Sequence, residues 1–248
     1  MRKGLLFLLV MIIVNFIGCE HIVFRLKHSE LIEKEIKLDK NNIVNVENTN
    51  GRITVSTHDK DFVLIKAEKF SNKKKYLGLI KLYFDLKEDG LYIYSKRDKK
   101  RIKFKVNYSI FVPIGLVKLE VSSTNGAIKV KGDLGIVDLS TTNGSIKLNG
   151  KFGKGNLSTT NGSIKAIQEN IINGDINIRT TNGSIRLTLN ADSNFKISGR
   201  TTNGSISSDF PVKVKKRITS SKISGEVGEG KFSVSLSTTN GSIKIYNK

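Results

Sequence analysis

The chain has 248 residues and a formal net charge of +20 at pH 7, from 42 Lys and Arg against 22 Asp and Glu. Only two Pro, no Trp and 22 Gly spread along the sequence are typical of strands and turns, and they argue against a disordered low-complexity chain. The charge favours anionic partners and says nothing about the fold.

The first 18 residues have the pattern of an export signal. Arg2 and Lys3 precede an uncharged apolar run, Leu5 to Ile17, that is too short to span a bilayer of about 30 Å. The sequence Phe16-Ile17-Gly18-Cys19 resembles the bacterial lipobox, with Phe16 in place of the usual Leu. We therefore predict a lipoprotein signal peptide at 1–18, lipidation of Cys19, and an exported, membrane-anchored lipoprotein that is periplasmic or at the cell surface. The alternatives are an ordinary secretory signal with a chance cysteine and a chance apolar N-terminus.

Residues 19–42 carry mixed charges and no clear strand pattern, so they are predicted as a tether, with a short helix as the alternative. Strands begin at Ile43, and one continuous domain is predicted over 43–248. Its first part contains a divergent turn at Asn50-Gly51. Further strands are predicted near 62–65, 80–86, 91–94 and 108–112.

A repeated hexapeptide, Thr-Thr-Asn-Gly-Ser-Ile, dominates the second half. Its Asn-Gly pairs are separated by 18, 18, 21, 21 and 37 residues. Fixed periods of this size indicate stacked supersecondary units. The predicted structural turns are Asn125-Gly126, Asn143-Gly144, Asn161-Gly162, Asn182-Gly183, Asn203-Gly204 and Asn240-Gly241.

The flanks of each Asn-Gly pair alternate between apolar and polar residues, as half-buried strands do. Around Asn143, for example, Leu139 and Ile146 are apolar while Ser140 and Lys147 are polar. Asn-Gly readily supplies two positive φ angles, so each copy is expected to be a tight turn. We predict an all-β, single-domain β-solenoid with 18 to 21 residues per coil, in which Thr and Asn form ladders; the alternative is an antiparallel meander or sandwich.

The 37-residue gap between the last two copies is close to two periods. It contains Phe210-Pro211 and a glycine-rich segment at 225–230. We predict that it forms a degenerate coil before the last copy, because the end coils of solenoids are often atypical caps.

The order of these motifs resembles the bacterial putative-adhesin family of β-strand repeat lipoproteins, a domain of unknown function. The resemblance rests on the segments at 50–55 and 108–113 and on the serial Asn-Gly-x-Ile coils, and it covers about residues 43–248. It implies a β-solenoid-like fold, export or membrane association, and no known catalysis.

Residues suited to catalysis or metal binding are sparse. The three histidines, His21, His28 and His58, lie outside the repeats, and the carboxylates fall singly. No metalloprotease, nucleophile-elbow or paired-cysteine motif is present. We therefore predict no enzyme activity, no cofactor and no metal site.

A basic residue follows the isoleucine of most copies. These candidate anion-binding residues are Lys129, Lys147, Lys165, Arg186 and Lys244, interrupted by Ser207. In a solenoid they would form one file, whose mutual repulsion must be screened by solvent, salt or an anionic ligand. The alternative is that exposed lysines only protect strands from aggregation.

These observations favour a lipid-anchored, non-enzymatic envelope protein, an adhesin or scaffold that binds through its solenoid surface. The expected partners are the membrane, through the N-terminal lipid, and an anionic glycan, a lipid headgroup or an envelope protein; nucleic acid is disfavoured. The alternative is an envelope-stress or signalling accessory module that acts through protein contacts, with its charge incidental.

Overall fold

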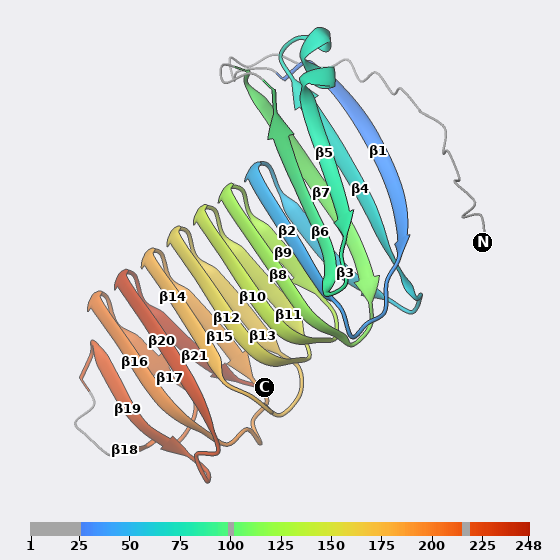
Figure 1. The fold of residues 1–248 in the computed structure, drawn as a ribbon. Coiled ribbons are helices and arrows are strands. Elements are labelled where there is room, and N and C mark those ends of the chain that lie inside the picture. The colour runs from blue at the N-terminus through green and yellow to red at the C-terminus, as the bar shows by residue number, and fades with distance from the viewer. Residues whose placement is uncertain (1–25, 99–101, 215–218) are drawn as a thin grey trace.

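The computed structural model describes residues 26–98, 102–214 and 219–248, and these form two long β-sheets that face each other (Figure 1). The helix of the described part is a 3-10 helix, η1 (Lys74–Leu79). None of the described helical structure is long and apolar enough to cross a membrane. The all-β prediction is therefore confirmed.

The two sheets, called sheet A and sheet B, have ten and eleven strands. In spatial order sheet A contains β1 (His28–Lys37), β4 (Phe62–Ser71), β7 (Phe104–Pro113), β3 (Ile53–His58), β9 (Ile128–Lys131), β11 (Ile146–Gly150), β13 (Ile164–Gln168), β15 (Ile185–Leu189), β21 (Ile243–Asn247) and β17 (Ile206–Ser208). Sheet B contains β18 (Lys213–Val214), β19 (Lys222–Val227), β16 (Phe195–Asn203), β20 (Phe232–Asn240), β14 (Ile176–Asn182), β12 (Phe152–Asn161), β10 (Leu134–Asn143), β8 (Leu116–Asn125), β2 (Ile43–Asn50), β6 (Gly90–Arg97) and β5 (Ile80–Leu86).

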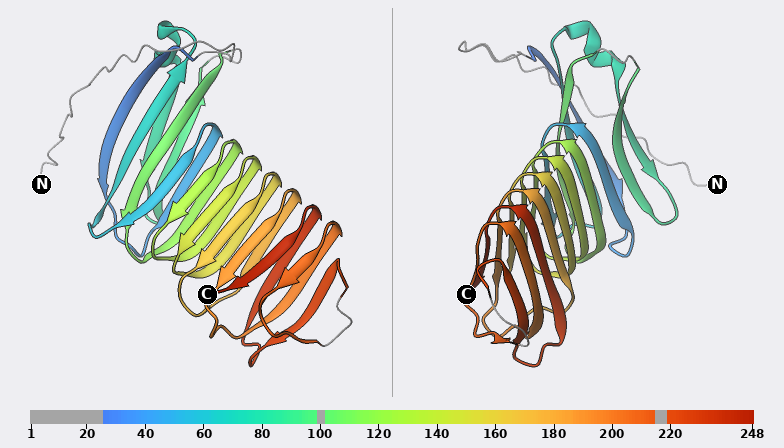
Figure 2. Two further views of the ribbon diagram at one scale, coloured as in Figure 1. Left: turned by 180° about the vertical axis from the view of Figure 1, so that it is seen from behind. Right: turned by 90° about the vertical axis from the view of Figure 1, so that its left-hand side faces the viewer.

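Each repeat is one coil of a solenoid, as predicted. A long strand in sheet B ends at the Asn-Gly corner, and a short strand in sheet A follows it (Figure 2). Neighbouring coils pair in parallel and in register, so that Asn143 lies between Asn125 and Asn161. Parallel pairing between copies rules out the antiparallel meander for the repeats.

The spatial order of the coils differs from their order in the sequence. The last copy, with Asn240, lies between the copies of Asn182 and Asn203, because β20 pairs with both β14 and β16. The prediction of a degenerate coil before the last copy is therefore wrong. Residues from the 37-residue gap instead form β19, which pairs antiparallel with β16 and covers the end of the stack.

The Asn-Gly pairs are corners between the two sheets, and their glycines have a different role from the predicted one. Among the seven glycines at the corners of Asn50, Asn125, Asn143, Asn161, Asn182, Asn203 and Asn240, only Gly51 and Gly241 have a positive φ. A Cβ on Gly144 would instead lie 2.2 Å from the carbonyl oxygen of Gly126, and one on Gly162 would lie 2.0 Å from that of Gly144. Glycine is therefore required because successive corners stack closely, which the prediction of two positive φ angles missed.

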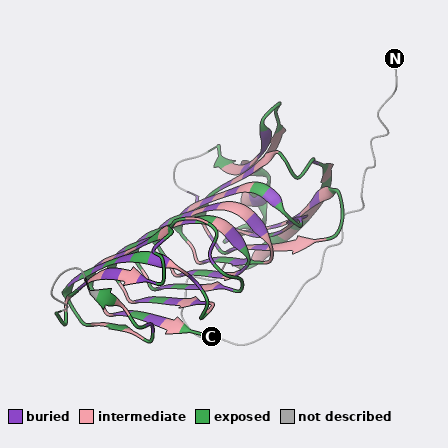
Figure 3. Cartoon of the chain, turned by 90° about the horizontal axis from the view of Figure 1, so that it is seen from below, coloured by how far each residue is buried: buried purple, intermediate pink, exposed green. Residues whose placement is uncertain are grey.

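The core lies between the sheets and is built from the inward residues of both. Burial alternates along the strands, as the coloured ribbon in Figure 3 shows. The isoleucine of the hexapeptide is at most 1 % exposed at Ile128, Ile146, Ile164, Ile185 and Ile243. Each such side chain contributes about 2 kcal/mol by removing its apolar surface from water. Ile206, in the edge strand β17, is only partly buried.

The N-terminal part differs from the tether predicted at 19–42, because residues 28–37 form β1. This strand pairs antiparallel with β4 along its full length. Two of its three acidic residues face lysines of β4: Glu30 lies 3.0 Å from Lys69, and Glu33 lies 3.1 Å from Lys66. The mixed charge that suggested a solvated segment thus belongs to an edge strand. The predicted strands near 62–65, 80–86, 91–94 and 108–112 are confirmed as β4 to β7.

Candidate binding surfaces

A ladder of asparagine side chains joins the corners of the stack. Each Nδ2 donates a hydrogen bond of 2.7 to 3.0 Å to the Oδ1 of the next asparagine toward the N-terminal end. In spatial order the members are Asn50, Asn125, Asn143, Asn161, Asn182, Asn240 and Asn203. All the side-chain amides therefore point the same way along the stack, which confirms the predicted ladder.

The first threonine of the hexapeptide is buried behind the corner. Its hydroxyl donates to the carbonyl oxygen of a corner glycine in the neighbouring coil, at 2.8 to 3.1 Å. The members of this file are Thr141, Thr159, Thr180, Thr201 and Thr238. The threonine hydroxyls thus donate to the backbone and not to one another. The recurring positions of the hexapeptide therefore have structural roles.

The basic residues after each isoleucine form one file on the outer face of sheet A, as predicted. Lys147 lies in register between Lys129 and Lys165, and Arg186 lies between Lys165 and Lys244. All five are exposed. With strands about 4.8 Å apart, the file is about 19 Å long. We call these five residues the basic file. It ends at Lys244, because the residue next to Lys244 on the neighbouring strand β17 is the uncharged Ser207.

No carboxylate occupies an outward position on the strands that carry this file. The other outward positions of β9, β11, β13, β15, β21 and β17 in the burial alternation are Lys131, Asn149, Ile167, Thr188, Tyr246 and Ser207. Within the described residues, none of the five cations forms an ion pair. Neighbouring unit charges at this spacing repel by roughly 1 kcal/mol even in water. A bound anion would relieve that repulsion.

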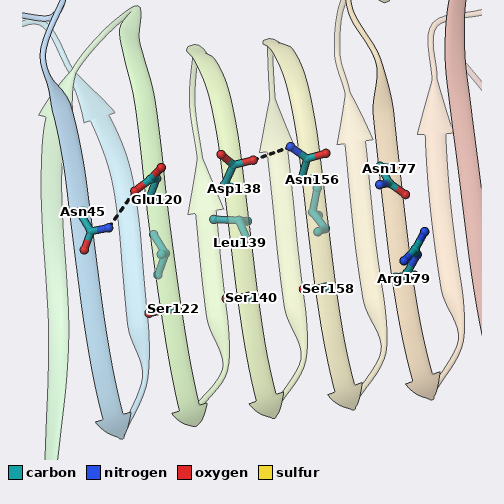
Figure 4. Close-up of a pocket in the computed structure, with 12 residues that line it drawn as sticks. Asn45, Glu120, Ser122, Asp138, Leu139, Ser140, Asn156, Ser158, Asn177 and Arg179 are labelled. Carbon is teal, nitrogen blue, oxygen red and sulfur yellow. Dashed lines mark hydrogen bonds between the residues drawn. The ribbon is translucent and has the colours of Figure 1, made fainter.

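The outer face of sheet B contains a shallow groove of about 450 Å³ (Figure 4). One row along it is polar, and Asn45 donates to Glu120 at 2.8 Å while Asn156 donates to Asp138 at 2.6 Å. Beside that row, the small side chains of Ser122, Ser140 and Ser158 form the floor of the groove. Asn177 and Arg179 continue the two rows on β14.

The charges of this groove are largely satisfied by one another. Lys118 pairs with Glu120 and lies 3.7 Å from Asp138. The hydrogen bond from Lys118, with that from Asn45, lowers the pKa of Glu120, and the bond to Glu120 raises the pKa of Lys118. Each partner favours the charged form of the other. The groove is therefore a self-neutralised polar surface, in contrast to the basic file.

The predicted site residues outside the repeats are placed as follows. Cys19 and His21 lie outside the described residues, so lipidation remains a prediction. His58 is structural, because its Nε2 lies 2.7 Å from the carbonyl oxygen of Phe62 and its ring packs edge-on against that of Phe62. Among the described residues there is no group of three His, Cys, Asp or Glu side chains that could hold a metal ion.

The polar row of sheet B was not predicted, although the sequence carries a signal for it. Glu120, Asp138 and Asn156 are each 18 residues apart, the same period as the corners. Any polar residues at the solenoid period lie in one row across the sheet.

Comparison with known proteins gives a family and a fold. A family profile described as Toastrack DUF4097 matches residues 18–246. No significant match was found among curated proteins. A Clostridium sporogenes structure described as a putative cell adhesion protein is 12 % identical with a TM-score of 0.50, over 88 % of this chain and 100 % of the other. A putative adhesin from Bacteroides fragilis is 15 % identical with a TM-score of 0.33, over 87 % and 96 %.

Proposed function

We propose, from the premise that this chain belongs to the DUF4097 toastrack family, that it is a non-enzymatic cell-envelope protein that binds anionic envelope polymers. The binding surface is the basic file on sheet A. A lipid on Cys19 holds the protein at the membrane, and the stack of coils serves as a scaffold or adhesion surface.

This proposal rests on two features of the basic file: its cations lie in register on adjacent strands, and they have no carboxylate partners among the described residues. Five cations stand on adjacent strands about 4.8 Å apart, and no outward position of those strands holds a carboxylate. Lys118 on sheet B, by contrast, is paired with Glu120. A row of like charges fits an extended polymer that carries an anionic group in each monomer.

Two further points support an adhesive role over a catalytic one. The residues suited to acid-base or nucleophilic chemistry are scattered in the sequence. The fold also resembles that of the Clostridium sporogenes protein, whose description names cell adhesion. That similarity supports the fold, and the basic file supplies the argument for an anionic ligand.

The salt dependence of binding tests this proposal. The full chain in detergent is titrated with polygalacturonate and with inorganic polyphosphate at several salt concentrations. Affinity should fall steeply with salt, and replacing Lys129, Lys147, Lys165 and Arg186 together by Gln should flatten the dependence. The matched control replaces the exposed Lys74, Lys87, Lys154 and Lys231 by Gln, which removes the same charge elsewhere. Equal effects of both quadruple variants would overturn the proposal.

The anchor is tested separately. Cys19→Ala should abolish labelling with a radioactive fatty acid and release the protein from the membrane fraction of the bacterium. Continued labelling and retention would show that Cys19 is not the lipidated residue.

A further inference from the structure

A basic pocket lies at the N-terminal end of the asparagine ladder. It has a volume of about 680 Å³, and it lies where the corners at Gly51 and Gly126 meet the beginning of β7. Its polar lining comes from Asn50, Arg52, Arg97, Lys103, Lys105, Asn107 and Asn125. We call it the ladder-end pocket; it is separate from the basic file and from the groove of sheet B.

The direction of the ladder leaves an unused donor in this pocket. Asn125 donates its Nδ2 to Oδ1 of Asn50 at 3.0 Å, and Asn50 is the last member. Its own Nδ2 has no hydrogen-bond acceptor among the described residues. Because hydrogen bonds in a chain polarise one another, six aligned bonds make this terminal N–H group a stronger donor than an isolated amide. The ladder thus presents its positive end to the pocket.

The charges around that donor have one sign. Among the described residues that line the pocket there is no carboxylate, whereas Arg52, Arg97, Lys103 and Lys105 are cationic. Lys105 is held over the ring of Phe70 at 4.4 Å, and Arg97 donates to the carbonyl oxygen of Ile102 at 3.3 Å. Asn107 accepts a bond of 3.0 Å from the backbone N–H of Arg52 through Oδ1, so its NH2 group is available as a further donor.

We infer that the ladder-end pocket binds a phosphate group. Its donors approach from several strands, so they suit a tetrahedral oxyanion with acceptor oxygens on every side better than a planar carboxylate. The Arg52 and Arg97 guanidinium groups can each donate two parallel hydrogen bonds to such a group. The phosphate is either the free ion or the headgroup of an anionic lipid, and both share this chemistry.

Calorimetry on the full chain in detergent tests this inference, with inorganic phosphate as the probe and ionic strength held constant. The double variant Arg52→Gln, Lys105→Gln should bind phosphate at least tenfold more weakly. The control Lys147→Gln, Lys165→Gln removes two charges from the basic file and should leave phosphate affinity unchanged. Equal weakening in both would mean that only net charge matters and would overturn the inference, without bearing on polymer binding to the basic file.

A single substitution isolates the ladder's contribution. Asn50→Asp keeps an oxygen that accepts from Asn125, and it replaces the free donor by a negative charge. Phosphate binding should be lost while the far-ultraviolet circular dichroism spectrum stays unchanged. Asn203→Asp adds the same charge at the opposite end of the ladder, and it should bind phosphate like the original chain. If Asn50→Asp binds normally, the pocket is not the site.

The source of the phosphate is distinguished by a second titration with soluble, short-chain phosphatidylglycerol below its micelle concentration. Tighter binding than inorganic phosphate, lost in Arg52→Gln, Lys105→Gln, assigns the pocket to a lipid headgroup. Tighter binding of inorganic phosphate assigns it to the free ion. Absence of binding by both probes would contradict the inference.

Discussion

The stack of coils and the N-terminal region reach stability by different means. In the stack, residues 43–58 and 116–247, each Asn-Gly corner contacts a copy of itself, and the same hydrogen bonds recur from coil to coil. In the N-terminal region outside that stack, antiparallel strands such as β1 and β4 depend on individual contacts, for example that of the buried Lys69 with Glu30. The stack therefore depends on the close approach of successive corner backbones, which the repeat makes possible at every coil. The N-terminal region depends on particular side-chain contacts.

The largest effect is expected at a corner glycine. Gly162→Ala places a methyl group 2.0 Å from the carbonyl oxygen of Gly144, and the backbone of the next coil cannot move away without losing its pairing. We expect a loss of about 3 kcal/mol or more in the free energy of unfolding. Gly78→Ala in η1 is the control, because nothing lies within 4 Å of the added carbon. Guanidinium unfolding followed by circular dichroism measures both; similar losses would refute the clearance argument.

The next effect tests the N-terminal region and the place of β1 in it. Lys69 is 7 % exposed, and its ammonium group also lies near the carbonyl oxygens of Leu77 and Ile80. Glu30→Gln removes its charged partner and should cost about 2 kcal/mol.

The matched control is Asp61→Asn, whose ion pair with Lys37 is 79 % and 86 % exposed. It should cost less than about 0.5 kcal/mol. Chemical unfolding distinguishes the two variants. If Glu30→Gln lowers the free energy of unfolding no more than the control does, the contact between β1 and β4 at Glu30 does not stabilise the fold.

A smaller effect is expected within the ladder. Asn161→Ala removes two hydrogen bonds, from Asn182 and to Asn143, and should cost about 1 kcal/mol because the side chains are exposed. Asn203→Ala removes a single ladder bond at the end of the stack and should cost about half as much. Thermal unfolding compares them. Equal losses of stability in the two variants would mean that the contributions of the ladder hydrogen bonds are not additive.

The smallest effect depends on pH. The pKa of Glu120 is lowered in the folded chain, so its charge adds stability above the ordinary glutamate pKa of about 4.3, and this contribution is lost as pH falls through the lower folded value. Glu120→Gln should therefore lower stability by about 0.5 kcal/mol at pH 7, since the pair with Lys118 is about a third exposed. The two chains should converge in acid. A difference that grows on acidification would contradict the lowered pKa.

Most of the stack can be predicted from the sequence, because a constant repeat length places equivalent residues side by side on adjacent strands. The alternation around Asn143, the ladder and the basic file all follow from placing like residues on adjacent strands. The order of the coils does not follow, because identical hexapeptides are interchangeable partners. Nothing local to Asn240 indicates that its coil lies between those of Asn182 and Asn203.

The N-terminal features escape prediction for a related reason. In β1, Glu30 and Glu33 resemble a solvated segment until the lysines of β4, more than 30 residues later, are placed opposite them. The ladder-end pocket likewise combines Asn50 with Lys105 and Asn107, which only the pairing of β3 with β7 brings together. Such contacts between distant and unlike segments leave no periodic signal.

The most direct test of the proposed function is a lysine-labelling footprint with and without polygalacturonate. An amine-reactive reagent modifies exposed lysines of the full chain, and mass spectrometry quantifies each site. The proposal predicts protection of Lys129, Lys147, Lys165 and Lys244 on sheet A, with little change at the exposed Lys74, Lys154 and Lys231. Protection that is uniform over the surface, or strongest at Lys154 on sheet B, would contradict it.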